Sequence, residues 1–246
     1  MKRLLLAGAL LAMGAANANA EFISIGGASA SGTTTGGETT SVSAEFYYDS
    51  AGGQLKIVLS NDSAAASGHF GNLLSGVLFD TNLTGLSYLN AMADGLVNVP
   101  TSSTQMIVPT DVDVTNHWDD AANFALNNVS YDYGVGAAGF GVFNGNLVNG
   151  PDYLITPLLG VIPNQNFVNL SPYSLNFVTF LFSAPTGVQD PSVSNIAMTL
   201  GTRPEFTSDG GGGFDGSTGA PEPATLALFG VVLAAGAMQL RRLTRK

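Results

Sequence analysis

Two aspartates one residue apart are the clearest candidates for metal chemistry in this sequence. Asp111 and Asp113 flank Val112, so on a β-strand both carboxylates point to the same side. Two neighbouring like charges repel each other, and a hard cation such as calcium relieves that repulsion through oxygen ligands. Asp119 and Asp120 follow closely, but the chain has no Asp-x-Asp-x-Asp-Gly calcium loop. Asp111 and Asp113 are therefore candidate calcium ligands, with a solvated acidic strand face as the favoured interpretation.

The two histidines, His69 and His117, are the candidates for proton transfer. His117 adjoins Trp118 and Asp119, a setting more typical of a structural role than of a general base. The chain has no Gly-x-Ser-x-Gly, no His-Glu-x-x-His and no convincing glutamate pair for glycoside hydrolysis. We predict no catalytic residue and no cofactor. A secreted hydrolase whose site is hidden from the sequence stays as an alternative.

Aromatic side chains offer a different chemistry, because flat rings with polar edges can stack on sugars. Most of them are expected in the core, and a carbohydrate-binding module that uses Trp118 is a second alternative. The residues concerned are Tyr47, Tyr48, Trp118, Tyr131, Tyr133 and Tyr153.

The most specific pattern lies at the C-terminus. Pro221, Glu222 and Pro223 precede the uncharged apolar stretch Ala224–Leu240. As a helix this stretch spans roughly 25 Å, enough to enter a bilayer core. The prolines prevent a helix from running through them, so Glu222 lies on an extended segment just outside the membrane. A basic tail at 241–246 then fixes orientation, because cationic flanks stay cytoplasmic; its charges are Arg241, Arg242, Arg245 and Lys246.

This tripartite tail, residues 220–246, resembles the PEP-CTERM sorting signal of bacterial envelope proteins. Pro221, Glu222 and Pro223 match the motif, and Ala220 stands where the common pattern often has valine. The resemblance implies that exosortase, a membrane cysteine peptidase, recognises the motif and removes the anchor. A permanent single-span anchor is the alternative.

The N-terminus is typical of a secretory signal peptide at residues 1–20. Lys2 and Arg3 precede the apolar run Leu4–Ala16, and Ala18 and Ala20 supply the small residues before the cut. Signal peptidase is therefore an expected partner. Together the two ends predict an exported protein that is transiently anchored in the inner membrane and then reaches the cell surface or the extracellular space.

Charge excludes several functions for the segment between the two ends. Of the 18 acidic residues only Glu222 lies outside Glu21–Gly219, and of the eight basic residues only Lys56 and Arg203 lie inside it. So acidic a domain repels nucleic acid, whose binding depends on Lys and Arg. The chain has no cysteine, which excludes disulfides, thiolate metal sites and a cysteine nucleophile.

The hydrophobic period within residues 21–208 is two. Apolar residues alternate with polar ones in three segments, which predicts half-buried strands; the alternating sets are Leu55, Ile57 and Leu59; Val129, Tyr131 and Tyr133; and Ile196, Met198 and Leu200. Phe177–Phe182 is apolar on both sides and is placed as a central strand. Further strands are expected at Glu45–Asp49, Gly76–Asp80 and Gly139–Phe143.

Short strands separated by Gly, Asn, Ser and Asp predict an all-β ectodomain, an antiparallel jelly-roll-like β-sandwich. Two segments are helical candidates: Leu86–Val97 and Asp119–Leu126. The Gly/Ser/Thr-rich segment Gly26–Thr40 is expected to form a loop or a flexible edge, and 209–219 a glycine-rich tether to the sorting signal.

The function predicted from the sequence is an exosortase-processed surface or matrix protein. Its acidic β-domain is expected to be non-catalytic and associated with exopolysaccharide or biofilm.

Overall fold

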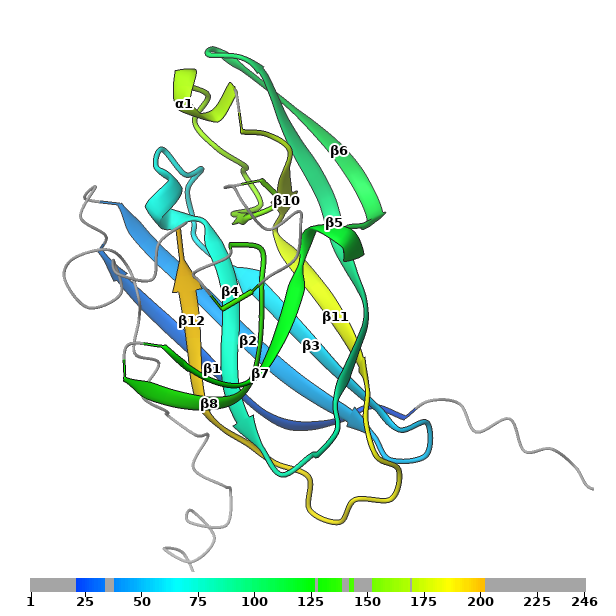
Figure 1. Cartoon of the computed structure of the whole chain (residues 1–246). Helices are drawn as coiled ribbons and strands as arrows, with labels where there is room; N and C mark the ends of the chain where they lie inside the picture. Colours follow the sequence, from blue (N-terminus) through cyan, green and yellow to red (C-terminus); the bar gives the residue numbers. More distant parts are fainter. Residues whose placement is uncertain are drawn as a thin grey trace, which may run out of the picture.

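The computed structural model describes residues 21–33, 38–126, 128–138, 142–143, 152–168 and 170–201. Strands dominate this part of the chain (Figure 1). In chain order they are β1 (Ile23–Thr33), β2 (Thr39–Asp49), β3 (Gln54–Asn61), β4 (Leu74–Thr81), β5 (Ser87–Thr101), β6 (Thr104–Asp113), β7 (Asp119–Leu126), β8 (Val129–Gly136), β9 (Ile155–Thr156), β10 (Tyr173–Leu175), β11 (Phe177–Ser183) and β12 (Val193–Leu200). The short helical elements are the 3-10 turns η1 (Phe70–Asn72) and η2 (Thr115–His117) and the helix α1 (Gln165–Val168).

These strands form one hydrogen-bonded sheet in the order β1-β2-β3-β11-β5-β10-β9-β4-β8-β7, with β12 beside β4 and β6 beside β5. The named strand pairs are antiparallel except β9 with β10. The all-β, antiparallel prediction is confirmed. The jelly-roll sandwich is not confirmed, because β9 and β10 join both halves of the fold into a single ladder.

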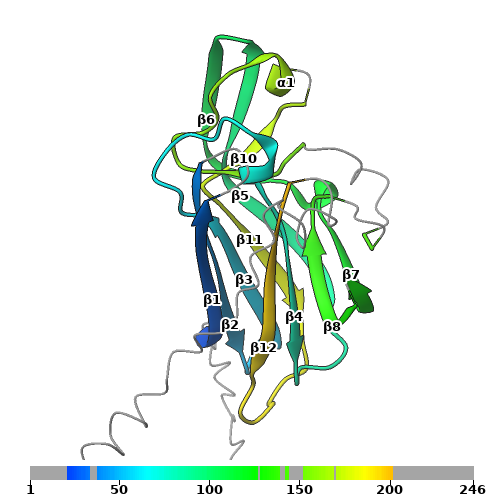
Figure 2. The same ribbon diagram turned by 90° about the vertical axis from the view of Figure 1, so that its left-hand side faces the viewer.

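The sheet curves so that distant strands share a core. Phe46 of β2 meets Phe79 of β4 at 4.9 Å between ring centroids, although five strands of the ladder (β3, β11, β5, β10 and β9) lie between β2 and β4. β4 and β12 accordingly lie over the β1–β3 region in Figure 1, and the turned view in Figure 2 shows them beside it. The strands facing this interior bury alternate side chains, as the period of two requires.

Most of the predicted strand faces are confirmed. Leu55, Ile57 and Leu59 are fully buried in β3. Ile196, Met198 and Leu200 are buried in β12. β11 lies between β3 and β5, as expected for a central strand.

One strand face was predicted wrongly in part. Tyr131 of β8 is buried and Tyr133 half-buried, but Val129 is 41% exposed. It begins β8 directly after Asn128, a turn residue with φ +64°, so it lies at the rim of the sheet.

Both helical predictions were wrong. Leu86–Val97 falls almost entirely within β5, a strand of 15 residues. Burial alternates along it, and its buried side chains include Ala91, Ala93, Val97 and Val99. Asp119–Leu126 is strand β7. The intrinsic helix preference of these alanine- and leucine-containing segments is small, and pairing with β11, β6 and β8 overrides it.

The glycine-rich segment forms regular structure where it is described. Gly26–Thr33 belongs to the edge strand β1, not to a loop, and Thr39–Thr40 begins β2. The expected strand Gly139–Phe143 lies mostly outside the described residues, and Val142 and Phe143 are not in a strand. The 209–219 segment is also outside them.

Candidate functional site

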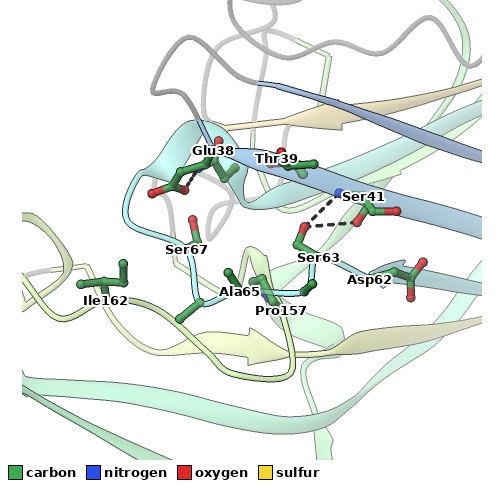
Figure 3. Close-up of a pocket in the computed structure, with 13 residues that line it drawn as sticks. Glu38, Thr39, Ser41, Asp62, Ser63, Ala65, Ser67, Pro157 and Ile162 are labelled. Carbon is green, nitrogen blue, oxygen red and sulfur yellow. Dashed lines mark hydrogen bonds between the residues drawn. The ribbon is translucent and has the colours of Figure 1, made fainter.

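A pocket of about 470 Å³ lies where the start of β2 meets the loop after β3 (Figure 3). Hydroxyl groups and carboxylates make up its polar lining, and alanine, proline and isoleucine side chains its apolar part. Its lining includes Glu38, Thr39, Ser41, Asp62, Ser63, Ser67, Asn72, Pro157 and Ile162.

The pocket exists because the end of β3 is held by a buried amide. Asn61 closes β3, and its Nδ2 donates 3.0 Å bonds to the carbonyls of Asn72 and Ile155. Its Oδ1 accepts a 2.7 Å bond from the Ser63 hydroxyl. The Asp62 N–H still donates to the Ser41 carbonyl of β2 at 2.8 Å, and the loop that follows forms part of the pocket wall.

Two serines fix the loop to β2. The Ser63 Oγ accepts the Ser41 backbone N–H at 3.0 Å, and the Ser43 hydroxyl donates to Asp62 Oδ2 at 2.6 Å. In Figure 3 Ser63 lies between Glu38 and Asp62, which occupy opposite ends of the pocket.

Glu38 is held at its end of the pocket by several donors. Its carboxylate accepts the Gly68 backbone N–H at 3.0 and 3.2 Å and a hydrogen bond from Asn72 Nδ2. A Cβ at Gly68 would lie 2.4 Å from Glu38 Oε1, so a larger residue there would displace the carboxylate from this position. The Asn72 Oδ1 is buried and has no hydrogen-bond partner within the described part of the chain.

This arrangement favours an uncharged ligand rich in hydroxyl groups. Two carboxylates supply hydrogen-bond acceptors, and no lysine or arginine is among the residues that line the pocket. An anion would meet only like charge there, whereas a neutral saccharide can donate to the carboxylates and exchange bonds with the serines and threonines. The volume is within the usual range for small-ligand sites.

The sequence did not single out this pocket. Its polar residues come from Glu38–Ser41 and Asp62–Ser67, two ordinary stretches of Ser, Thr and Ala. Only the antiparallel pairing of β2 with β3 brings them together. A local signal existed in Asn61-Asp62-Ser63, a turn-forming triplet at the end of an alternating strand.

Asp111 and Asp113 both lie on β6 with exposed side chains. Asp113 Oδ1 accepts the Thr115 N–H at 2.9 Å, and hydrogen bonds from Thr115 lower the pKa of this carboxyl. Among the described residues no group of three His, Cys, Asp or Glu side chains is placed to hold a metal ion.

The two histidines have different surroundings. His69 is exposed just before η1. The His117 ring stacks on Tyr153 with centroids 3.6 Å apart and an interplanar angle of 14°. Burial lowers the pKa of His117, while the carboxylates of Asp152 and Asp113 oppose that shift.

The lowered His117 pKa predicts a loss of stability in mild acid. The unfolded chain takes up a proton near pH 6.5 before the folded chain does, so stability present above that pH falls as pH drops towards the folded-state pKa. Between about pH 7.5 and pH 5, we expect the Tm of the wild type to fall on the order of 1 °C more than that of His117→Gln. Thermal unfolding followed by circular dichroism measures this, and equal pH dependence of the two proteins would contradict it.

The alternative in which Trp118 is a sugar platform is wrong, and the expectation that most of these aromatic residues lie in the core is confirmed for Trp118. Trp118 is only 3% exposed and packs edge-on against Phe180, with ring centroids 4.8 Å apart. Tyr48 is fully buried, and its hydroxyl donates to the Pro185 carbonyl. Tyr47 keeps partial exposure, but the Lys56 ammonium lies 4.5 Å from its ring centroid.

The sorting residues lie outside the described part of the chain. These are Ala18 and Ala20, Pro221, Glu222 and Pro223, and Arg241, Arg242, Arg245 and Lys246. Within the described residues, no helix has the length and apolar character needed to cross a bilayer.

Comparison with known families identifies the C-terminal segment. The model of the PEP-CTERM protein-sorting motif matches residues 220–242. No curated protein and no solved structure matches the chain. The motif confirms the resemblance seen in the sequence and supports a protein that is exported, targeted to exosortase and located at the cell surface or outside the cell.

Proposed function

We propose that this protein is a non-catalytic component of the cell surface or extracellular matrix, released from its membrane anchor by exosortase and associated with exopolysaccharide. The observation that carries the proposal is the PEP-CTERM motif at residues 220–242. It lies beyond an acidic, cysteine-free β-domain, so the domain is what remains to act after processing.

The hydroxyl-lined pocket supports the association with a polysaccharide. Its carboxylates are positioned by the protein before any ligand arrives: Glu38 by Gly68 and Asn72, and Asp62 by Ser43. Such preorganisation lowers the entropic cost of binding. The acceptors suit a neutral sugar unit, while Pro157 and Ile162 offer apolar contact to its ring faces.

The bonding of the pocket serines supports binding without catalysis. Ser63 donates its hydroxyl proton to Asn61 Oδ1, and Ser67 donates to the His69 carbonyl. Amide and peptide oxygens are not general bases, so these bonds do not activate either serine as a nucleophile.

Processing is tested by replacing the motif glutamate. We expect the exported wild-type protein to end near Pro221–Pro223, whereas Glu222→Ala retains the C-terminus through Lys246. Mass spectrometry of the exported protein from the producing cell measures the end directly. Glu205→Ala removes the same charge outside the motif and should be processed normally. An intact Lys246 on the exported wild-type form would refute processing.

Polysaccharide binding is tested separately with matched aspartates. Asp62 and Asp111 are both exposed, so Asp62→Asn and Asp111→Asn change the net charge equally. We expect Asp62→Asn to weaken binding to polysaccharide from the producing cell roughly tenfold, because a charge-assisted hydrogen bond is lost. Asp111→Asn should bind like the wild type. Calorimetry measures both, and wild-type affinity of Asp62→Asn would exclude this pocket as the binding site.

A further inference from the structure

The outer edge of β6 carries an unusual concentration of exposed aliphatic side chains. Six of the nine large hydrophobic residues that are exposed in the described chain lie on β6 or on the neighbouring loop after β9. We call this set the apolar tip: Met106, Ile107, Val108, Leu158, Leu159 and Ile162, which are 43–59% exposed. Among the described strands β6 pairs only with β5, and both views show its other side open (Figures 1 and 2).

The two parts of the apolar tip are fixed to each other. Gln105 Nε2 donates to the Leu159 carbonyl at 2.9 Å, and the Val161 N–H donates to Gln105 Oε1 at 3.0 Å. Gly160 lies between them with φ +74°, and a Cβ there would be 2.4 Å from Gln105 Oε1. The loop is therefore held against β6, and the surface does not have to be ordered by a partner.

Charge singles out this edge as a contact between copies. The domain is strongly acidic, so two copies repel each other where carboxylates face carboxylates. Residues 95–110 and 153–189 contain no charged side chain. These are the segments that build the apolar tip, so two copies can meet there without bringing charges together.

The other described strands that pair with a single neighbour, β1, β7 and β12, are less suitable. β1 consists mostly of Gly, Ala and Ser, which bury little apolar area, and its exposed large aliphatic residue is Ile23 at one end. Its Gly26 packs against Val193 of β12, so these two edges partly cover each other. β7 begins with two adjacent aspartates, which protect an edge against pairing. β6 combines an open edge with large aliphatic side chains.

We propose that two copies of this protein associate through β6, antiparallel and about a two-fold axis at Ile107. In an antiparallel sheet the side chains of two directly opposite residues lie on the same face, whereas neighbouring residues of one strand lie on opposite faces. A two-fold axis perpendicular to the sheet must therefore pass where one residue lies opposite its own copy, and not between two neighbouring residues. Centring at Ile107 pairs it with its own copy and pairs Met106 with Val108. Asp111 then lies opposite Ser103, in the uncharged turn, and Asp113 lies beyond that turn. The three exposed aliphatic residues of β6, Met106, Ile107 and Val108, then meet one another, and no carboxylate faces a second one.

The contact depends mainly on side chains. Pro109 has no backbone N–H, so it removes one donor from β6 and keeps any intermolecular ladder short. Packing of the aliphatic residues of the two copies must supply most of the association.

The absence of cysteine makes a direct test available. In full-length Ile107→Cys, mild oxidation within the producing cell's envelope should link two copies across the axis. Leu89→Cys is the matched control, since Leu89 has the same 44% exposure but lies in the part of β5 that pairs with β11. We expect roughly tenfold more cross-linked dimer from Ile107→Cys on non-reducing gels, because association raises the effective thiol concentration.

A second variant distinguishes a second copy of the protein from a lipid surface as the occupant of the apolar tip. In the exported protein, Ile107→Lys should convert a dimer to a monomer in analytical ultracentrifugation, while Leu89→Lys stays dimeric. Equal cross-linking of the two cysteine variants, or a monomeric wild type at all concentrations, would overturn the proposal. So would binding of a monomeric wild type to phosphatidylcholine vesicles that Ile107→Lys abolishes, because the occupant would then be lipid.

Discussion

Phe180→Ala is expected to lower the free energy of unfolding by about 3–5 kcal/mol, the usual cost of emptying a phenylalanine site in a core. Phe180 is fully buried near the middle of β11, between β3 and β5. Its ring meets Trp118 edge-on, so the substitution also removes an aromatic contact between β11 and the segment before β7. Strands on both sides of β11 would line the resulting cavity.

Urea denaturation followed by circular dichroism measures this loss. Phe180→Leu keeps most of the volume and should cost clearly less, which separates cavity formation from a disturbed strand. Leu89→Ala, at an exposed site on β5, is the surface control. A loss for Phe180→Ala no larger than that of Leu89→Ala would mean that β11 is not the centre of the core.

Asn61→Ala is the second large effect, with an expected loss on the order of 2–3 kcal/mol. The substitution removes the Asn61 donor from the buried carbonyls of Asn72 and Ile155, and it leaves the Ser63 hydroxyl only the longer 3.3 Å bond to the Ser41 carbonyl. Asn61 is 1% exposed, so water cannot easily replace these bonds. Because Asn61 shapes the loop of the pocket, polysaccharide binding should weaken together with stability.

Asn61→Asp tests the same bonds through pH. The shape is kept, but an ionised carboxylate would face two carbonyl oxygens, so burial raises its folded-state pKa above the unfolded value of about 3.9. The folded state then holds the proton more tightly, and the deficit relative to the wild type is largest at neutral pH and shrinks as pH falls towards 4. A deficit that does not change with pH would show that the amide does not donate to these carbonyls.

The period-two patterns predicted the strands well where burial alternates locally. Leu55, Ile57 and Leu59 have polar neighbours and one buried face, so the sequence records the environment directly. β5 shows why the same reasoning failed elsewhere. Its partners β11, β10 and β6 all come later in the chain, and their contacts outweigh the local preferences of Leu86–Val97.

The candidate sites also differ in how far a local stretch of sequence reveals them. A sorting motif is read as a short extended segment, so Pro221, Glu222 and Pro223 were recognisable without a fold. Most of the aromatic residues were correctly expected in the core, but the sequence could not say which ones, because ring chemistry is the same in a core and on a surface. Trp118 lies in the core for a reason that only its contact with Phe180 reveals.

The sequence by itself determined the sorting signal, the acidic character and the all-β class of this protein. Those properties depend on local order and composition: a Pro-Glu-Pro segment before an apolar stretch, a near absence of Lys and Arg, and alternating side chains. Only the tertiary structure decided where the hydroxyl-lined pocket and the apolar tip lie. Both are assembled from segments far apart in the chain, Glu38 with Asp62 and Pro157, and Gln105 with Leu159, which strand pairing and long-range hydrogen bonds bring together.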